Sequence, residues 1–387
     1  MSKVKYQRLG DIVNFKRGYD LPAHQRKQGN YPVVSSSGIS GYHSEYKADG
    51  EGIVTGRYGT LGEMHYVNGK YWPHNTALYV TDFKGNYPKY VYYLLKCLGN
   101  LKTSDKSAVP GVNRNDLHAL FVPYIANGQE NIAAVLSSID QKIEINNRIN
   151  AELEAMAKNL YDYWFVQFDF PDENGKPYKS SGGEMVYSKE LKREIPAGWK
   201  VKELHQIANI TMGQSPEGSS YNEEGKGIVF FQGSTDFGIR FPNIRQYTTE
   251  PSRLAKAGDI LLSVRAPVGT MNIADIDCCI GRGLAALNSK DGFDAYLFYV
   301  MEYFKRLFDR RNSEGTTFGS ITKSDLFSLQ VAYPNNLVLK AYNDVIAINN
   351  KLVLKNQKEN QQLAALRDWL LPMLMNGQVQ VTDTKNH

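Results

Sequence analysis

Two stretches of the chain place apolar residues at alternating steps of four and three. The first stretch carries Ile132, Leu136, Ile139 and Ile143, followed by Leu153, Ala157, Leu160 and Trp164. The second carries Val345, Ile348 and Leu352, followed by Leu363, Leu366 and Leu370. This spacing is typical of helices that pack along a narrow seam, and it predicts long helices over about 129–165 and 337–371.

Both seams also contain polar positions. Asn146 and Asn150 lie in the first seam, and the polar stretch Lys355–Gln362 interrupts the second, which Pro372 is expected to bend or end. A segment of an ordinary helical bundle is one interpretation. However, neither helix can bury so narrow a stripe alone, so we expect the two to pack together, antiparallel, as a coiled coil. The residues expected between them are Ile139, Ile143, Leu153, Ile348, Leu352 and Leu363.

The segments that precede each long helix have a different pattern, in which short apolar runs alternate with Gly, Tyr and Ser. Examples are Gly52–Gly56, Ala77–Val80, Asp259–Val264 and Gly283–Leu287. Such runs predict strands joined by turns. One amphipathic helix is expected near Tyr90–Leu98, and its counterpart near Tyr296–Phe304.

These elements recur in the same order, which indicates a duplication. Residues 6–18 resemble 201–213 at an offset of 195, residues 90–95 resemble 296–301 at 206, and residues 112–117 resemble 321–326 at 209. Loop insertions would produce this drift. We therefore expect an α+β fold in which 1–168 and 198–375 superpose. Two similar mixed α/β domains, 1–125 and 198–335, would each precede a long helix, at 126–168 and 336–375. A connector (169–197) and a tail (376–387) complete the chain.

Composition narrows the choice of partner without deciding it. The 45 Lys and Arg exceed the 40 Asp and Glu by five, a balance that permits nucleic-acid binding but does not require it. The 25 tyrosines suggest a surface that contacts another molecule. Three cysteines without a C-x-x-C pair, together with no secretory signal and no membrane-length apolar run, indicate a reducing cytoplasm.

A search for catalytic motifs returns one weak match. The chain has no phosphate-binding loop for ATP, no dinucleotide-binding glycine pattern and no histidine pairing suited to a metal. Asp172, Glu190 and Lys192 fit the loose PD…ExK pattern of metal-dependent nucleases. Because their surroundings are strongly charged, we interpret all three as connector residues and keep a self-sufficient nuclease as a third possibility.

Two loops in each half combine turns with basic, hydroxyl and aromatic groups, which suits contact with phosphates and base edges. The first pair of loops carries Arg57, Tyr58 and Thr60 in one half, and Ser263 and Arg265 in the other. The second pair carries Lys106, Ser107, Asn113 and Arg114 in one half, and Thr316, Thr317 and Lys323 in the other. Arg57 and Arg265 align if one gap is allowed, and we expect them to read bases, whereas Lys106 and Lys323 suit phosphate. Ordinary polar loops are the alternative.

A family resemblance becomes visible in Asp140–Asn147, Asn159–Phe165, Ile195–Trp199 and Gly258–Arg265. Together with the order of elements, these stretches resemble the specificity subunit of type I restriction–modification enzymes. The resemblance implies two target recognition domains that each read half of a split double-stranded DNA site. It also implies a helical spacer that docks methyltransferase (modification) subunits, in a prokaryotic cytoplasm. The segment Thr55–Tyr58 departs from the Ser-Val-Arg form kept at Ser263–Arg265.

The resemblance further implies that the chain has no catalytic residues, binds no metal and holds no cofactor. S-adenosylmethionine, ATP and Mg²⁺ would belong to the partner methyltransferase and restriction/translocase subunits. The competing hypothesis is a duplicated coiled-coil adaptor that never meets DNA. Salt dependence separates the two, because binding to the DNA backbone weakens steeply as salt rises.

Overall fold

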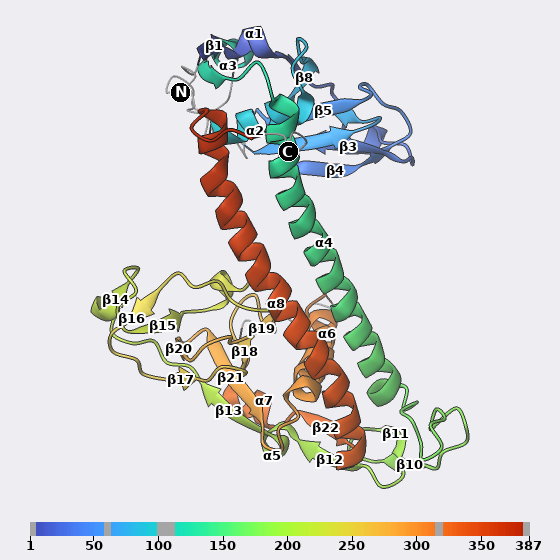
Figure 1. Cartoon of the computed structure of the whole chain (residues 1–387). Coiled ribbons are helices and arrows are strands. Elements are labelled where there is room, and N and C mark those ends of the chain that lie inside the picture. Colours follow the sequence, from blue (N-terminus) through green and yellow to red (C-terminus); the bar gives the residue numbers. More distant parts are fainter. Residues whose placement is uncertain (1–4, 58–62, 99–112, 314–319, 382–387) are drawn as a thin grey trace, which may run out of the picture. The chain divides into compact units, whose positions relative to one another are not determined.

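The computed structural model describes residues 5–57, 63–98, 113–313 and 320–381 (Figure 1). The chain divides into two compact units, which we call unit 1 (1–145 with 359–387) and unit 2 (146–358). Each unit contains one globular domain and a part of both long helices, α4 (Gln129–Tyr161) and α8 (Asn336–Met375). The units are described separately below.

The globular domain of unit 1 is built on two small sheets. The four-stranded sheet has the order β2-β8-β5-β6 and is antiparallel, whereas the three-stranded sheet β4-β3-β7 contains a parallel β3–β7 pair. A separate pair joins β1 to β9. The strands are β1 (Lys5–Arg8), β2 (Asn14–Arg17), β3 (Tyr31–Ser35), β4 (Gly38–His43), β5 (Glu51–Gly56), β6 (Met64–Asn68), β7 (Trp72–Pro73), β8 (Ala77–Asp82) and β9 (Phe121–Tyr124). The short helices are α1 (Leu9–Ile12), η1 (Ala23–Gln25), α2 (Pro88–Cys97) and α3 (Arg114–Ala119).

The globular domain of unit 2 repeats this topology. Its four-stranded sheet β13-β21-β18-β19 and its pair β12–β22 match their counterparts strand for strand. Its five-stranded sheet β14-β16-β15-β20-β17 contains the three-stranded arrangement at its centre. The strands are β12 (Lys200–Glu203), β13 (Ala208–Met212), β14 (Tyr221–Asn222), β15 (Ile228–Phe231), β16 (Tyr247–Thr248), β17 (Leu254–Ala255), β18 (Ile260–Ser263), β19 (Met271–Ile273), β20 (Cys278–Ile280), β21 (Leu284–Ser289) and β22 (Gln330–Tyr333).

The helices follow the same plan, so the expected duplication is confirmed. In unit 2, α5 (Leu204–Ile207), η3 (Gly218–Ser220), α6 (Asp294–Ser313) and α7 (Lys323–Phe327) take the places of α1, η1, α2 and α3, with one extra turn, η4 (Ser234–Asp236). The helix predicted near Tyr296–Phe304 is longer in the structure. Pro372 lies inside α8 without ending it at that residue, and Gly377, at φ 65°, follows the last turn.

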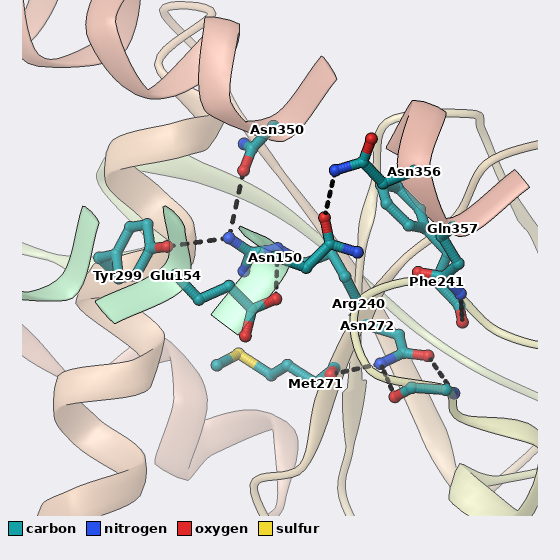
Figure 2. A network of polar contacts seen from close by, with 11 residues as sticks. Asn150, Glu154, Arg240, Phe241, Met271, Asn272, Tyr299, Asn350, Asn356 and Gln357 are labelled. Carbon is teal, nitrogen blue, oxygen red and sulfur yellow. Dashed lines mark hydrogen bonds and ion pairs between the residues drawn. The ribbon is translucent and has the colours of Figure 1, made fainter. Parts of the chain in front are cut away.

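Within unit 2 the two long helices run antiparallel. The Tyr342 hydroxyl donates to the Ala157 carbonyl at 3.2 Å, and further along α8 the Asn356 amide donates to Asn150 Oδ1 at 2.9 Å (Figure 2). Because a rising α8 number meets a falling α4 number, the helices point in opposite directions. Both asparagines of the second contact are buried, so the seam accepts polar groups by pairing them with each other.

Within unit 1 the remaining parts of the same helices are also antiparallel. The Lys142 ammonium lies 3.3 Å from the Glu359 carboxylate, and Arg367 Nη1 donates to Asp140 Oδ1 at 2.8 Å. Further on, Leu374 packs in the same hydrophobic cluster as Leu136. Ile139 is buried, and Ile143 and Leu363 are half-buried, at positions that continue the seam.

For the second helix, the prediction of which side faces the seam is wrong in unit 2. Ile348 is 69% exposed and Leu352 40% exposed, so neither lies in the seam. Besides Val338 in the first turn, the buried positions of α8 in this unit are Leu339, Tyr342, Ile346, Asn349, Val353 and Asn356. They keep the spacing of three and four but are shifted by one residue. The prediction chose the wrong side because two of the true seam positions are asparagine, whereas the exposed side carries Val and Ile. Leu153, on α4, is half-buried as expected.

The connector packs more than its composition suggests. Phe170 and Ile195 of the connector are buried in the largest hydrophobic cluster of unit 2, together with the flanking Phe168 and Trp199. The stacked rings of Phe170 and Trp199 have their centroids 5.2 Å apart. A π-helical turn, η2 (Asp162–Val166), leads into this segment, and β10 (Met185–Ser188) pairs with β11 (Arg193–Pro196). Among the described residues, no helix is long and apolar enough to cross a membrane.

Candidate nucleic-acid interface

In unit 1, four loops meet where strands β2, β3, β5 and β7 end. The Gly18 and Arg57 amides donate to the carbonyls of Ala77 and Thr76, each at 3.0 Å, and the His74 amide donates to the Val34 carbonyl at 2.8 Å. We call Tyr19, Ser36, Arg57, His74 and Thr76 loop cluster 1. All five residues are partly accessible, and together they offer cationic, hydroxyl, imidazole and phenol groups.

Unit 2 brings the corresponding loops together with the same backbone hydrogen bonds. The Gly213 and Val264 amides donate to Leu284 and Gly283, each at 2.9 Å, and the Gly281 amide donates to Phe231 at 2.9 Å. The accessible side chains here are Gln214, Ser215, Gln232, Arg265 and Arg282, which we call loop cluster 2. Gln232 Nε2 donates to Ser215 Oγ at 3.1 Å, and the Arg282 amide donates to the same oxygen at 3.3 Å.

The glycine shared by the two repeats has a structural cause. A Cβ atom on Gly18 would lie 2.2 Å from the His74 carbonyl oxygen, and one on Gly213 would lie 2.2 Å from that of Gly281. These distances are far below van der Waals contact, so only glycine allows the first loop to approach the last one. The match between Gly18 and Gly213 in the sequence therefore marks the point where each cluster closes.

The matching hydrogen bonds correct one expectation. Arg57 and Val264 make the equivalent bond, so Arg57 corresponds to Val264, which is buried, and not to Arg265. Arg265 lies one residue further and is exposed. Ser263 is also misjudged as a surface group, because it is 2% exposed and its hydroxyl donates to the Arg265 carbonyl at 2.8 Å. Its role in the structure is to shape the turn that presents Arg265.

The second pair of predicted loops is described only in part. Arg265 and Ser320 form an antiparallel bridge, and the Ile321 amide donates to the Val264 carbonyl at 2.9 Å, so the chain that leads to exposed Lys323 runs beside loop cluster 2. Lys323 begins α7, just as Arg114 begins α3. Tyr58, Thr60, Lys106, Ser107, Thr316 and Thr317 lie outside the described residues.

Asn113 has a role of its own at the start of α3. Its side chain accepts a hydrogen bond from the Asn115 amide at 3.0 Å, which caps the helix. Thr322 caps α7 in the other repeat by accepting from the Asp325 amide. The resemblance between residues 112–117 and 321–326 therefore reflects a shared helix start.

Sequence reasoning missed several members of the clusters: Tyr19, His74, Gln214, Gln232 and Arg282. They come from single loop positions with no motif around them. The available signal was positional, because each follows the end of a short strand in a duplicated order. Burial lowers the pKa of His74, with Arg26 adding to the effect, so its ring is neutral near pH 7 and can both donate and accept.

The residues of the nuclease-like pattern serve their own turns. Asp172 Oδ1 accepts from the Asn174 and Lys176 amides, both at 2.8 Å. Glu190 accepts from the Ser188 hydroxyl at 2.9 Å, and Lys192 has a positive φ of 53° in the β10–β11 turn. Across the described part of the chain, no cluster of three or more His, Cys, Asp or Glu side chains could hold a metal ion.

Comparisons with known proteins agree with this architecture. The family model for the type I restriction modification DNA specificity domain matches residues 1–155 and 196–360. The chain is 34% identical over 303 residues to the "Putative type I restriction enzyme MjaX specificity subunit" of Methanocaldococcus jannaschii, covering 75% of this chain and 68% of that protein. It is 27% identical over 315 residues to the type I restriction enzyme MjaIX specificity subunit of the same organism, covering 76% and 70%.

A solved structure shows a similar fold. The crystal structure of a type I restriction-modification system S subunit from M. genitalium aligns with a TM-score of 0.62 at 16% identity. The alignment covers 99% of this chain and 98% of that one.

Proposed function

Because the chain belongs to the type I restriction modification DNA specificity family, we propose that it is the DNA-reading subunit of a type I restriction–modification complex. It recognises a bipartite double-stranded site, with one half read by the domain at 1–125 and the other by the domain at 198–335. It carries no catalytic residues of its own. The methylation and cleavage chemistry, with S-adenosylmethionine, ATP and Mg²⁺, belongs to partner subunits that meet it in a prokaryotic cytoplasm.

The observation that carries this proposal is the occurrence of two loop clusters at the same place in a duplicated fold. Each gathers hydrogen-bonding and cationic side chains at the ends of four strands, yet the side chains themselves differ. Arg57 and His74 of loop cluster 1 correspond to Val264 and Gly281. Two readers with one frame and different side chains recognise two different half-sites, so the whole target is not a palindrome.

The charged residues in and beside the clusters divide into two roles. Arg57, Arg265 and Arg282 extend from loops at the strand ends, and Arg is the commonest bidentate reader of guanine in the major groove. Lys323 lies at a helix start beside loop cluster 2 and is assigned to phosphate. The uncharged groups, such as Gln232 and His74, suit bases that present both a donor and an acceptor.

An apolar side of the helix pair in unit 2 is the docking surface for a modification subunit. Ile149 and Met156 on α4, and Val345, Ile348 and Leu352 on α8, are all 38% exposed or more. Each of them precedes a seam position by one residue. In an antiparallel pair such positions fall on the same side, so the five form one exposed aliphatic strip.

The opposite side of this helix pair is already occupied. Glu154, Asn350 and Gln357 each follow a seam position by one residue, and all three contact the globular domain of unit 2. The aliphatic strip therefore remains available to another protein. Because the relatives are named as subunits of an enzyme, we assign the aliphatic strip to a modification subunit.

Titration of DNA binding by the complete chain, assembled with its modification subunits, tests the proposal. The expected result is an affinity that falls when either half-site is scrambled and that decreases linearly with salt on a log–log plot. Arg265→Ala should cost about 1–3 kcal/mol against one half-site only. Binding that ignores sequence and salt would refute DNA reading and favour the adaptor hypothesis.

A further inference from the structure

The two repeats differ in the segment that follows their matching strands β3 and β15. Val34 corresponds to Phe231, and Tyr42 corresponds to Tyr247, by the register of the strand pairs. Ser35 follows Val34 as Gln232 follows Phe231. From these two residues to the matched tyrosines, the first repeat uses six residues, 36–41, and the second uses fourteen, 233–246. The eight additional residues of this 233–246 segment form no regular strand, and they require a separate explanation.

Arg240, in the middle of this segment, is 4% exposed and reaches three helices of unit 2 (Figure 2). Its Nη2 donates to the Tyr299 hydroxyl of α6 at 2.8 Å and to Asn350 Oδ1 of α8 at 3.1 Å. Its Nε lies 3.7 Å from the Glu154 carboxylate of α4, and the Phe298 ring lies 4.0 Å from the guanidinium carbon. A single side chain thus joins the globular domain to both long helices.

Neighbouring contacts hold the segment in this position. Gln357 of α8 donates to the Phe241 carbonyl at 3.1 Å, and the Ile273 amide of β19 donates to the Arg240 carbonyl at 2.8 Å. The Asn272 side chain accepts from the Gly238 amide at 3.0 Å and donates to its carbonyl at 3.1 Å. The segment is therefore fixed to its own domain on one side and to α8 on the other.

The corresponding junction of unit 1 is made without such a segment. Tyr93 occupies the position in α2 that Tyr299 occupies in α6, and its hydroxyl donates to Asp140 of α4 at 2.7 Å. The arginine that completes this junction, Arg367, comes from α8. In unit 2 the arginine comes from the globular domain itself, so the domain supplies its own attachment to the helix pair.

A buried guanidinium is costly unless its donors are satisfied, and its planar fork restricts the directions from which acceptors can approach. Nη2 of Arg240 has two acceptors, whereas among the described residues Nε makes no hydrogen bond and is compensated only by the nearby Glu154 carboxylate. Burial raises the pKa of Glu154, an effect opposed by Arg240 and increased by Glu302. Arg240 therefore favours the charged form of a carboxyl group that burial disfavours. Contacts with both long helices leave the domain little freedom to rotate about the helix pair.

We propose that Arg240 is a positioning residue that fixes the second recognition domain on the helix pair and thereby makes the chain selective for the separation between its two half-sites. This inference rests on the proposed function, because separation matters only if both domains read DNA. Arg240 does not contact DNA in this proposal. It determines where loop cluster 2 is held, not which bases that cluster prefers.

The test compares Arg240→Met with wild type, each as the full chain assembled with its modification subunits. The DNA carries the target found by methylation mapping, with the half-sites at the natural separation or one base pair closer or further apart. Wild type should prefer the natural separation strongly. Arg240→Met should lose at least about tenfold of that preference, the equivalent of one charge-assisted hydrogen bond, while the penalty for a scrambled half-site stays unchanged.

Two further variants and one control complete the test. Arg240→Lys retains the positive charge but lacks the planar guanidinium, so it should keep part of the preference for the natural separation that Arg240→Met loses. A general loss of folding would not rank wild type, Arg240→Lys and Arg240→Met in this order. Asn350→Ala removes one acceptor and provides a milder change if Arg240→Met does not fold. Arg245→Met is the matched control, because Arg245 lies in the same segment but is 55% exposed and pairs with Asp236.

The outcomes separate this inference from the proposed function. If wild type has no preference for any half-site sequence, the proposed function fails, and the inference fails with it. If wild type reads both half-sites but folded Arg240→Met keeps the same preference for separation, only the inference is overturned. A loss of affinity that is equal at every separation would likewise overturn it.

Discussion

The position of the seam in α8 can be tested by two substitutions of the same kind, two residues apart. Ile346 is fully buried in the main cluster of unit 2, whereas Ile348 is 69% exposed. Ile346→Ala removes three buried carbons, worth about 2.4 kcal/mol at about 0.8 kcal/mol each. The cavity left behind adds to this, so we expect a loss of about 2–5 kcal/mol in the free energy of unfolding.

Ile348→Ala should be almost neutral. Less than a third of the side chain is buried, so the same arithmetic gives a loss below about 0.8 kcal/mol, and the higher helix propensity of Ala offsets part of it. Urea unfolding of the full chain, followed by far-UV circular dichroism, measures both as a midpoint shift multiplied by the m-value. Equal losses, or a larger loss for Ile348→Ala, would refute the assigned seam.

Three further predictions concern separate parts of the chain. Ile348→Asp, at the most exposed position of the aliphatic strip, should weaken association with the modification subunit by at least about tenfold while shifting the unfolding midpoint only slightly, as measured by calorimetric titration and urea unfolding. Lys323→Ala should weaken binding to all DNA sequences alike and lower the log–log salt slope by about one; a change confined to one half-site would contradict its assignment to phosphate. Asp172→Ala combined with Glu190→Ala should leave DNA cleavage by the assembled complex intact, and abolished cleavage with assembly and DNA binding preserved would reverse this interpretation.

The duplication and the first long helix could be predicted from the sequence because each depends on a pattern repeated many times. The seam from Ile132 to Trp164 keeps its spacing through Asn146 and Asn150, so two polar residues did not hide it. In the second helix the seam includes Asn349 and Asn356, and a competing row of Val345, Ile348 and Leu352 lies one residue away. A prediction based on hydrophobicity alone therefore assigned the wrong residues to the seam, because the exposed side of this helix is more apolar than the buried side.

The loop clusters could be predicted only in part. Arg265 lies in a recognisable stretch, but Gln232 and Arg282 belong to a site only because the ends of β15 and β20 lie side by side. Such neighbours depend on the parallel pairing of strands that are nearly fifty residues apart. The charged surroundings of Asp172 and Glu190 led to the prediction that neither takes part in chemistry, and the structure adds the turns in which each is held.

The most direct test of the central claim is a map of adenine methylation in cells that express the chain with its modification subunits. Two loop clusters that share a frame but differ in side chains should produce one bipartite motif with two dissimilar halves at a fixed separation. Arg265→Ala should change the sequence of one half and leave the other half intact. A continuous motif, a motif that persists without the chain, or the simultaneous loss of both halves in Arg265→Ala would contradict the account.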